Sequence, residues 1–200
     1  MGVGILGGTF DPVHLGHLVI AEEVRVRLGL DKTIFIPAGE PWLKQSRPIT
    51  PAVHRVEMVR RAISSNPHFV LSLLEIERAG PTHTIDTVTM LKQMLGAQVE
   101  LFLILGLDTL MQLPEWRKPD QLIKLCRLAV VNRPGYDLSD ISRLEEALHG
   151  VSSCISEVKV PDIGISSTEI RERVKKGVSI RYLVPTAVEE YIAERGLYSQ

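Results

Sequence analysis

The chain has few cysteines, almost no net charge and no long hydrophobic run, and each shortage excludes a class of protein. Cys126 and Cys154 are too few and too isolated for a disulfide framework or a zinc knuckle. We expect two partly buried thiols in a reducing compartment. The formal net charge of −1 provides no basic field, which argues against broad nucleic-acid binding. The longest strongly apolar run, at 101–107, is far too short to span a bilayer, so we expect no membrane association.

Targeting signals are also missing from the N-terminal residues. Residues 2–6 carry no basic region and no cleavage site follows them, whereas a signal peptide needs both. Leu6 stands where a myristoylation motif needs Ser or Thr. We therefore expect a soluble cytoplasmic protein. An apolar fraction of 44% is enough for one sizeable core. With no repeat or long linker, we expect residues 1–200 to form a single domain.

Apolar runs and helical patterns alternate along the chain. We expect strands at 3–7, 33–38, 69–76, 99–105, 128–132 and 154–160. We expect helices at 15–28, 51–65, 85–95, 119–125, 139–148, 167–176 and 186–195. The alternation predicts an α/β fold: a doubly wound, mainly parallel, Rossmann-like sheet with a small helical C-terminal portion. Such sheets bind ligands at the carboxyl ends of their strands, so the loops after the strands are the places to search.

The first informative stretch is GILGGTFDPVHLGH, at 4–17. One apparent match, the G-x-G-x-x-G pattern from Gly2 to Gly7, is rejected because its glycines fall inside the expected strand and not in the turn after it. The turn itself runs from Gly7 through Gly8, Thr9 and Phe10 to Pro12, and His14 and His17 follow at the helix start. Glycines allow close backbone approach, and a helix N-terminus favours anions. Both imidazoles can face one polyanion, so we predict a phosphate-binding loop.

Two other interpretations of the histidine pair remain open. A zinc site needs at least a third protein ligand, and no carboxylate or thiol lies at a telling spacing, so we expect no protein metal site. A single histidine at a helix start is more often structural than functional. The pair behind a Gly-Gly turn favours phosphate binding over that structural alternative.

The second informative stretch is DIGISSTEIRERVKKG, at 162–177. Ser166, Ser167 and Thr168 are good N-cap candidates for the following helix. Arg171 lies one turn inside, where a cation is unfavourable unless an anion is present. Alone, this pattern suits a capped surface helix. Together with the first stretch, it suggests two helix N-termini that hold a triphosphate from both ends.

Both stretches resemble the paired signatures of the nucleotidylyltransferase superfamily, whose H-x-G-H motif is here His14-Leu15-Gly16-His17. Further segments narrow the resemblance to bacterial nicotinate-mononucleotide adenylyltransferases. These segments are IPAGEPWLK, GPTHTIDT, LILGLDTL, EWRKPDQL, VNRPG and YLVPTAVEEYIAERGLY. The resemblance covers nearly the whole chain and implies adenylyl transfer from ATP to nicotinate mononucleotide, with pyrophosphate released.

The resemblance also implies a role for individual residues. The ATP site would comprise Gly8, Thr9, Phe10, His14, His17, Gly106, Asp108, Ser167, Thr168 and Arg171, with His14, His17 and Arg171 acting in catalysis. Lys44 would contact the mononucleotide's phosphate, and Thr84 and Trp116 would frame its pyridine ring. His83 stands where the family usually has Tyr, which is a departure from the family's pattern. The alternatives are that Trp116 is a packing residue, that Lys44 is a solvated surface residue and that Asp108 is a helix cap.

The implied reaction needs no general base, because the attacking phosphate monoester, with a second pKa of about 6, is already largely dianionic at neutral pH. We expect Mg²⁺ to be carried with ATP. A phosphopantetheine adenylyltransferase, a non-catalytic nucleotide-sensing module and a tRNA-synthetase-like fragment remain alternatives. The sequence leaves a homo-oligomer open.

Overall fold

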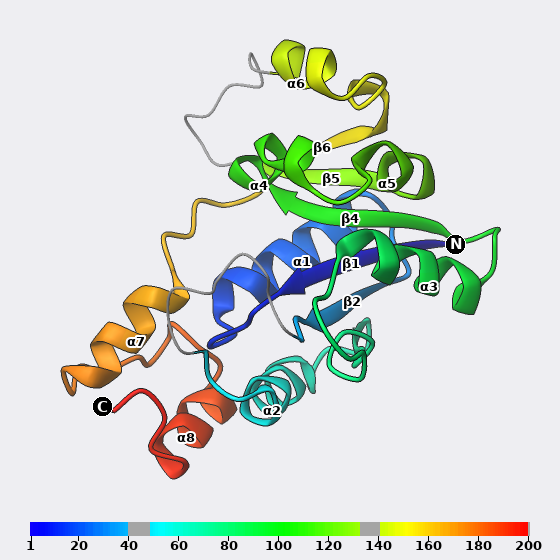
Figure 1. Ribbon diagram of the computed structural model, residues 1–200. Coiled ribbons are helices and arrows are strands. Elements are labelled where there is room, and N and C mark those ends of the chain that lie inside the picture. The colour runs from blue at the N-terminus through cyan, green and yellow to red at the C-terminus, as the bar shows by residue number, and fades with distance from the viewer. Residues whose placement is uncertain (40–48, 133–140, 200) are drawn as a thin grey trace. The chain divides into compact units, whose positions relative to one another are not determined.

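A computed structural model describes residues 1–39, 49–132 and 141–199, and it has the expected α/β architecture (Figure 1). The strands are β1 (Gly2–Gly8), β2 (Lys32–Pro37), β3 (Phe69–Leu71), β4 (Glu100–Gly106), β5 (Arg127–Asn132) and β6 (Ile155–Lys159). They form one sheet in the order β3-β2-β1-β4-β5-β6. β1 pairs with β4, β4 with β5 and β5 with β6, each in parallel. This doubly wound strand order confirms the predicted Rossmann-like sheet.

Helices flank the sheet and, apart from α4, which was not predicted, they begin and end close to the predicted residues. They are α1 (Leu15–Arg27), α2 (Ala52–Ile63), α3 (Thr84–Leu95), α4 (Leu107–Met111), α5 (Pro119–Leu125), α6 (Ile141–Ala147), α7 (Ser167–Lys175) and α8 (Thr186–Glu194). α1 ends just before Gly29, whose φ of +63° suits glycine. α7 begins after Ser166, whose hydroxyl accepts a hydrogen bond from the Glu169 N–H. Within the described ranges, no helix is long and apolar enough to cross a bilayer.

Two sequence predictions about these elements were wrong. The strand expected at 69–76 ends at Leu71. The Ser72 N–H still donates to the Phe35 carbonyl at 2.9 Å, but the following residues form a turn in which the Glu77 N–H donates to the Leu73 carbonyl at 2.9 Å. The stretch from 106 to 117, which separates the strand expected at 99–105 from the helix expected at 119–125, contains α4 and a short 3-10 turn at 113–115. Both are too short to produce a periodic pattern that the sequence reveals.

The chain divides into two compact units, which we describe separately. The first comprises residues 1–6, 21–34 and 82–162. Its core includes the consecutively buried residues 101–105 of β4, as expected for a strand covered on both faces. The second comprises residues 7–20, 35–81 and 163–200, and in it α2 packs against α8. The single-domain expectation for residues 1–200 stays a prediction.

The glycines of the rejected dinucleotide pattern are packing residues in the first unit. A Cβ atom at Gly2 would lie 2.9 Å from Leu30 Cδ2, and one at Gly4 would lie 3.1 Å from Thr33 Oγ1. Both distances are shorter than ordinary van der Waals contact, so a side chain at either position would require its neighbour to shift. Their role in β1 supports the rejection of a dinucleotide turn here.

Candidate functional site

The loop after β1 is anchored by a buried aromatic ring. Phe10 has a φ of +51° and is 2% exposed, and its ring lies 5.9 Å from that of Phe35. The peptide bond between Asp11 and Pro12 is cis. The chain then enters α1 at Leu15, whose N–H donates to the Leu183 carbonyl at 3.0 Å. The loop is thus connected both to the apolar interior of the second unit and to its C-terminal segment.

The two predicted histidines lie against each other at the start of α1. Their ring centroids are 3.7 Å apart with an interplanar angle of 31°, and the Phe10 ring meets His17 edge-on at 5.1 Å. The His14 main-chain N–H donates to His17 Nδ1 at 3.2 Å. Because Nδ1 is the acceptor, the proton of a neutral His17 ring lies on Nε2. The backbone therefore selects the tautomer that offers a hydrogen-bond donor from Nε2.

Gly16 provides the space that His14 occupies. A Cβ atom at position 16 would lie 3.0 Å from His14 Nδ1 and 3.2 Å from its Cε1. The nearest atom of a more distant segment is Ile163 Cγ2, at 3.7 Å. Any larger residue between the two histidines would displace the His14 ring, so the glycine of the H-x-G-H motif has a steric role at this position.

The second informative stretch lies against the loop, as the sequence interpretation required. Ser167 Oγ donates to the Pro12 carbonyl at 2.8 Å, across 155 positions of sequence. Arg171 Nη1 donates to the Asp11 carbonyl at 2.6 Å, and its Nη2 donates to Thr168 Oγ1 at 3.1 Å. The carbonyl oxygen of Asp11 thus gives the Arg171 guanidinium a partner with a partial negative charge near the N-terminus of α7. The predicted phosphate-contacting residues of both stretches therefore gather within the second unit.

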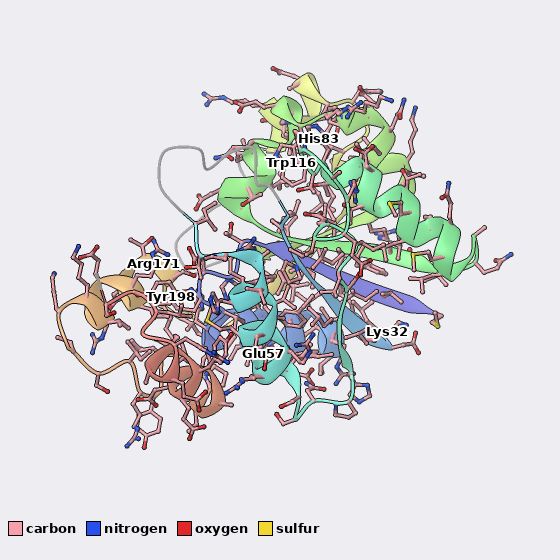
Figure 2. All side chains as sticks on the ribbon, turned by 60° about the horizontal axis from the view of Figure 1, so that its bottom comes forward. Lys32, Glu57, His83, Trp116, Arg171 and Tyr198 are labelled. Atoms are coloured by element: carbon pink, nitrogen blue, oxygen red, sulfur yellow. The ribbon has the colours of Figure 1, made fainter. Side chains whose placement is uncertain are left out.

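Three residues that the sequence interpretation did not select complete this cluster. Asp11 and Arg55 are each 2% exposed, and Arg55 donates through Nη1 to the Thr9 carbonyl at 2.9 Å. Tyr198 Oη donates to Asp11 Oδ1 at 2.8 Å (Figure 2 labels Tyr198 and Arg171). A signal for Arg55 exists in the sequence: it precedes Val59 by four residues and so lies on the apolar face of α2.

Burial and charge shift the pKa of two of these groups. Burial lowers the pKa of the Arg55 guanidinium, and the negative charge of Asp11 partly opposes that shift. Burial raises the pKa of the Tyr198 hydroxyl, and the charge of Asp11 raises it further. Tyr198 therefore stays protonated and available as a donor throughout the physiological pH range.

The residues predicted to frame the pyridine ring lie in the first unit. Thr84 is the first residue of α3, after His83, and Trp116 follows the turn at 113–115 (Figure 2 labels His83 and Trp116). Arg117 and Asp86 form an ion pair at 3.7 Å, which connects the Trp116 segment to the first turn of α3. The indole Nε1 of Trp116 is shielded from solvent and has no hydrogen-bond partner in the described part of the chain.

The other predicted positions lie at the end of β4 or outside the described residues. Gly106 is the N-cap of α4, and Asp108 lies in its first turn; both are exposed. Asp108 is therefore not the cap residue of that helix. Lys44 lies outside the described residues. Within residues 1–39, 49–132 and 141–199, no group of three or more His, Cys, Asp or Glu side chains could hold a metal ion.

Comparison with known families and curated proteins finds one matching family and relatives that share one name. The cytidylyltransferase-like family model matches residues 5–173. A probable nicotinate-nucleotide adenylyltransferase of Dehalococcoides mccartyi is 47% identical over 195 residues, covering 98% of this chain and 96% of that protein. The protein of the same name from Salinispora tropica is 46% identical and is covered over its whole length.

Solved structures agree with the fold. Nicotinic acid mononucleotide adenylyltransferase of Plasmodium falciparum, complexed with NaAD, superposes with a TM-score of 0.79 at 18% identity, covering 98% of this chain and 97% of that one. A putative nicotinate-nucleotide adenylyltransferase of Vibrio parahaemolyticus has a TM-score of 0.71 at 16% identity, covering 100% and 96%. At such low identity these likenesses establish the fold alone.

Proposed function

The chain belongs to the cytidylyltransferase-like family, and from that premise we propose that it transfers the adenylyl group of ATP to nicotinate mononucleotide. The products are nicotinate adenine dinucleotide and pyrophosphate, in the biosynthesis of NAD. The proposal rests on the hydrogen bonds that join the loop before the H-x-G-H motif to the first residues of α7. Relatives that share nearly the whole chain at 46–47% identity bear the name of this activity.

The phosphates of ATP are the ligand of the loop and of α7. His17 offers Nε2–H because its Nδ1 is occupied by the His14 N–H, and the N-terminus of α7 adds a dipole that favours anions. Gly8, Thr9 and Phe10 contribute backbone to this site, with His14, Ser167, Thr168 and Arg171 beside it. These donors oppose the charge that builds on the departing pyrophosphate.

The attacking group is the phosphate of the mononucleotide, which is largely dianionic at neutral pH. Catalysis therefore consists of aligning two anions and neutralising charge on the leaving group, without a general base. This agrees with a site formed by imidazole, hydroxyl and guanidinium groups. Lys44 is the proposed partner of the mononucleotide's phosphate, and Gly106 and Asp108 border the adenosine.

The pyridine ring stacks on Trp116, and its carboxylate meets donors at the start of α3. The N–H of Thr84 lies in the first turn of that helix, where the dipole favours a negative group. Donors of this kind favour an acid over an amide, because the amide's NH₂ group finds no acceptor among them.

Mg²⁺ would be carried with ATP, where it would neutralise charge on the phosphate oxygens. The nitrogen and hydroxyl donors of the loop and α7 suit the phosphate oxygens, whereas Mg²⁺ prefers carboxylates and water and usually keeps several waters. The described thiols Cys126 and Cys154 are both free, which suits a cytoplasmic location.

The test is a turnover screen that measures pyrophosphate release from ATP with nicotinate mononucleotide, nicotinamide mononucleotide, phosphopantetheine or no acceptor. We expect release with the first and far less with the second, on the order of 10⁴-fold in kcat/KM for a site built to hydrogen-bond the acid. Turnover with phosphopantetheine alone would replace the proposal with the related adenylyltransferase. ATP binding without any turnover would indicate a nucleotide-sensing protein.

A further inference from the structure

Side chains from three separate segments hold residues 9–12 of the loop. Arg55 of α2 donates to the Thr9 carbonyl at 2.9 Å. Ser167 and Arg171 of α7 donate to the carbonyls of Pro12 and Asp11 at 2.8 and 2.6 Å. Tyr198, beyond α8, donates to the Asp11 carboxylate at 2.8 Å. Since the loop leads directly into His14 and His17, whatever moves residues 9–12 moves both imidazoles.

These contacts also set the polarity of the loop. A carbonyl oxygen directed at a phosphate would repel it, and the carbonyls of Thr9, Asp11 and Pro12 are instead occupied by protein donors. In a trans peptide the N–H group points opposite to the carbonyl, so the N–H of Phe10 points away from Arg55. The contacts thus keep negative ends of the loop's dipoles turned toward the protein.

Tyr198 reaches Asp11 because the chain reverses after α8. Gly196 has a φ of +58°, and the Leu197 N–H donates to the Ile192 carbonyl at 3.0 Å, which ends the helix and turns the backbone. The Asp11 carboxylate is 2% exposed, and a buried charge depends on every donor that faces it. The main-chain N–H of Thr50 is a weaker donor to its other oxygen, at 3.5 Å.

We infer that Tyr198 is a positioning residue for adenylyl transfer, which acts through Asp11 to hold the loop that carries His14 and His17. The expected effect on kcat rests on the proposed function. The expected effect on the position of the loop rests on the loop contacts alone. Tyr198 touches no substrate in this account. Its loss leaves the Asp11 charge short of a donor, and the loop then relaxes away from the geometry that aligns the leaving phosphates.

Tyr191 provides a matched control. It also lies in the C-terminal part of the second unit and is 4% exposed, and its hydroxyl bonds His54 Nδ1 at 2.9 Å. Its ring lies beneath the guanidinium of Arg61 on α2, at 4.5 Å. No contact described for Tyr191 involves residues 9–12. Tyr191→Phe therefore removes one buried, hydrogen-bonded hydroxyl without touching the loop.

The experiment compares Tyr198→Phe with Tyr191→Phe in kcat, KM, melting temperature and hydrogen exchange of the amides at 13–17. We expect Tyr198→Phe to lower kcat by about 10- to 100-fold, the range for a sub-ångström to 1 Å misplacement, with the KM for nicotinate mononucleotide within about twofold. Exchange at 13–17 should accelerate. Tyr191→Phe should lower the melting temperature comparably and leave kcat and loop exchange unchanged.

Equal kcat losses in the two variants, or unchanged exchange at 13–17 in Tyr198→Phe, would overturn the inference. If Tyr198→Phe does not fold, Asp11→Asn serves instead, since it keeps an oxygen acceptor for the hydroxyl but weakens the bond; the same loop amides should then exchange faster. A wild-type protein without adenylyl transfer contradicts the proposed function only, because the exchange measurement still decides the role of Tyr198.

Discussion

Replacing Gly16 with alanine should uncouple activity from stability. Gly16 is the second residue of α1, and alanine is better than glycine inside a helix by about 0.5–1 kcal/mol. The added Cβ would lie 3.0 Å from His14 Nδ1, against an ordinary contact distance of 3.4–4 Å, so the ring must retreat by several tenths of an ångström. The steric pressure offsets the helical gain, and we expect a melting temperature within about 4 °C of wild type.

Activity should respond much more strongly than stability. His14 is 8% exposed and lies against His17 at 3.7 Å, so its ring has little freedom to move without disturbing the pair. Because a 1 Å misplacement can reduce a rate by about 100-fold, we expect Gly16→Ala to lower kcat by roughly 10- to 100-fold. The assay is pyrophosphate release at saturating ATP and nicotinate mononucleotide, beside a thermal melt of the same preparation.

A double-mutant cycle identifies the cause. If Gly16→Ala acts only through the displaced ring, it has no further effect once His14→Ala has removed that ring. Additive losses in the double variant would show that the glycine serves something other than room for His14. Ordinary activity in Gly16→Ala would refute the steric argument altogether.

Three further predictions concern separate parts of the molecule. His17→Ala should keep the fold and slow turnover by about 10²–10³, the usual loss for one preorganised donor, and either an unfolded variant or normal kcat would contradict the phosphate assignment. Trp116→Ala should weaken nicotinate mononucleotide binding by about 1–3 kcal/mol and leave ATP binding unchanged in calorimetric titrations; equal losses would make Trp116 a packing residue. The hydroxyl of Ser152 and the N–H groups of Ser152 and Gly150 lower the pKa of Glu145 from 4.5 to about 2. Its stabilisation is therefore present above pH 4.5 and lost as pH falls toward 2, so the melting-temperature difference between wild type and Glu145→Gln should shrink over that interval, and a constant difference would exclude the effect.

Much of the fold followed from local patterns in the sequence. The strand expected at 99–105 and the helix expected at 15–28 correspond to β4 and α1, because their apolar patterns act over a few neighbouring residues. The same holds for the Ser166 cap at the start of α7. β3 was predicted too long and α4 was missed, since the pairing of a short strand and the presence of a single helical turn depend on distant packing.

The site was predicted in part for the same reason. The residues of GGTFDPVHLGH and ISSTEIR carry their signal in local spacing, and the resemblance to a known family supplied their roles. The Nε2–H tautomer of His17 and the space that Gly16 leaves for His14 depend on where rings and backbone meet in three dimensions. No spacing along the chain shows either.

Asp11, Arg55 and Tyr198 became recognisable only in the tertiary structure. Asp11 and Tyr198 are 187 positions apart, and nothing in the local sequence of either predicts the other. The partner of a buried charge is chosen by the packing of the whole unit, because burial makes an unpaired carboxylate or guanidinium too costly to keep. The sequence by itself indicated which residues we propose to bind a phosphate chain, and the tertiary structure decided which side chains hold them in place.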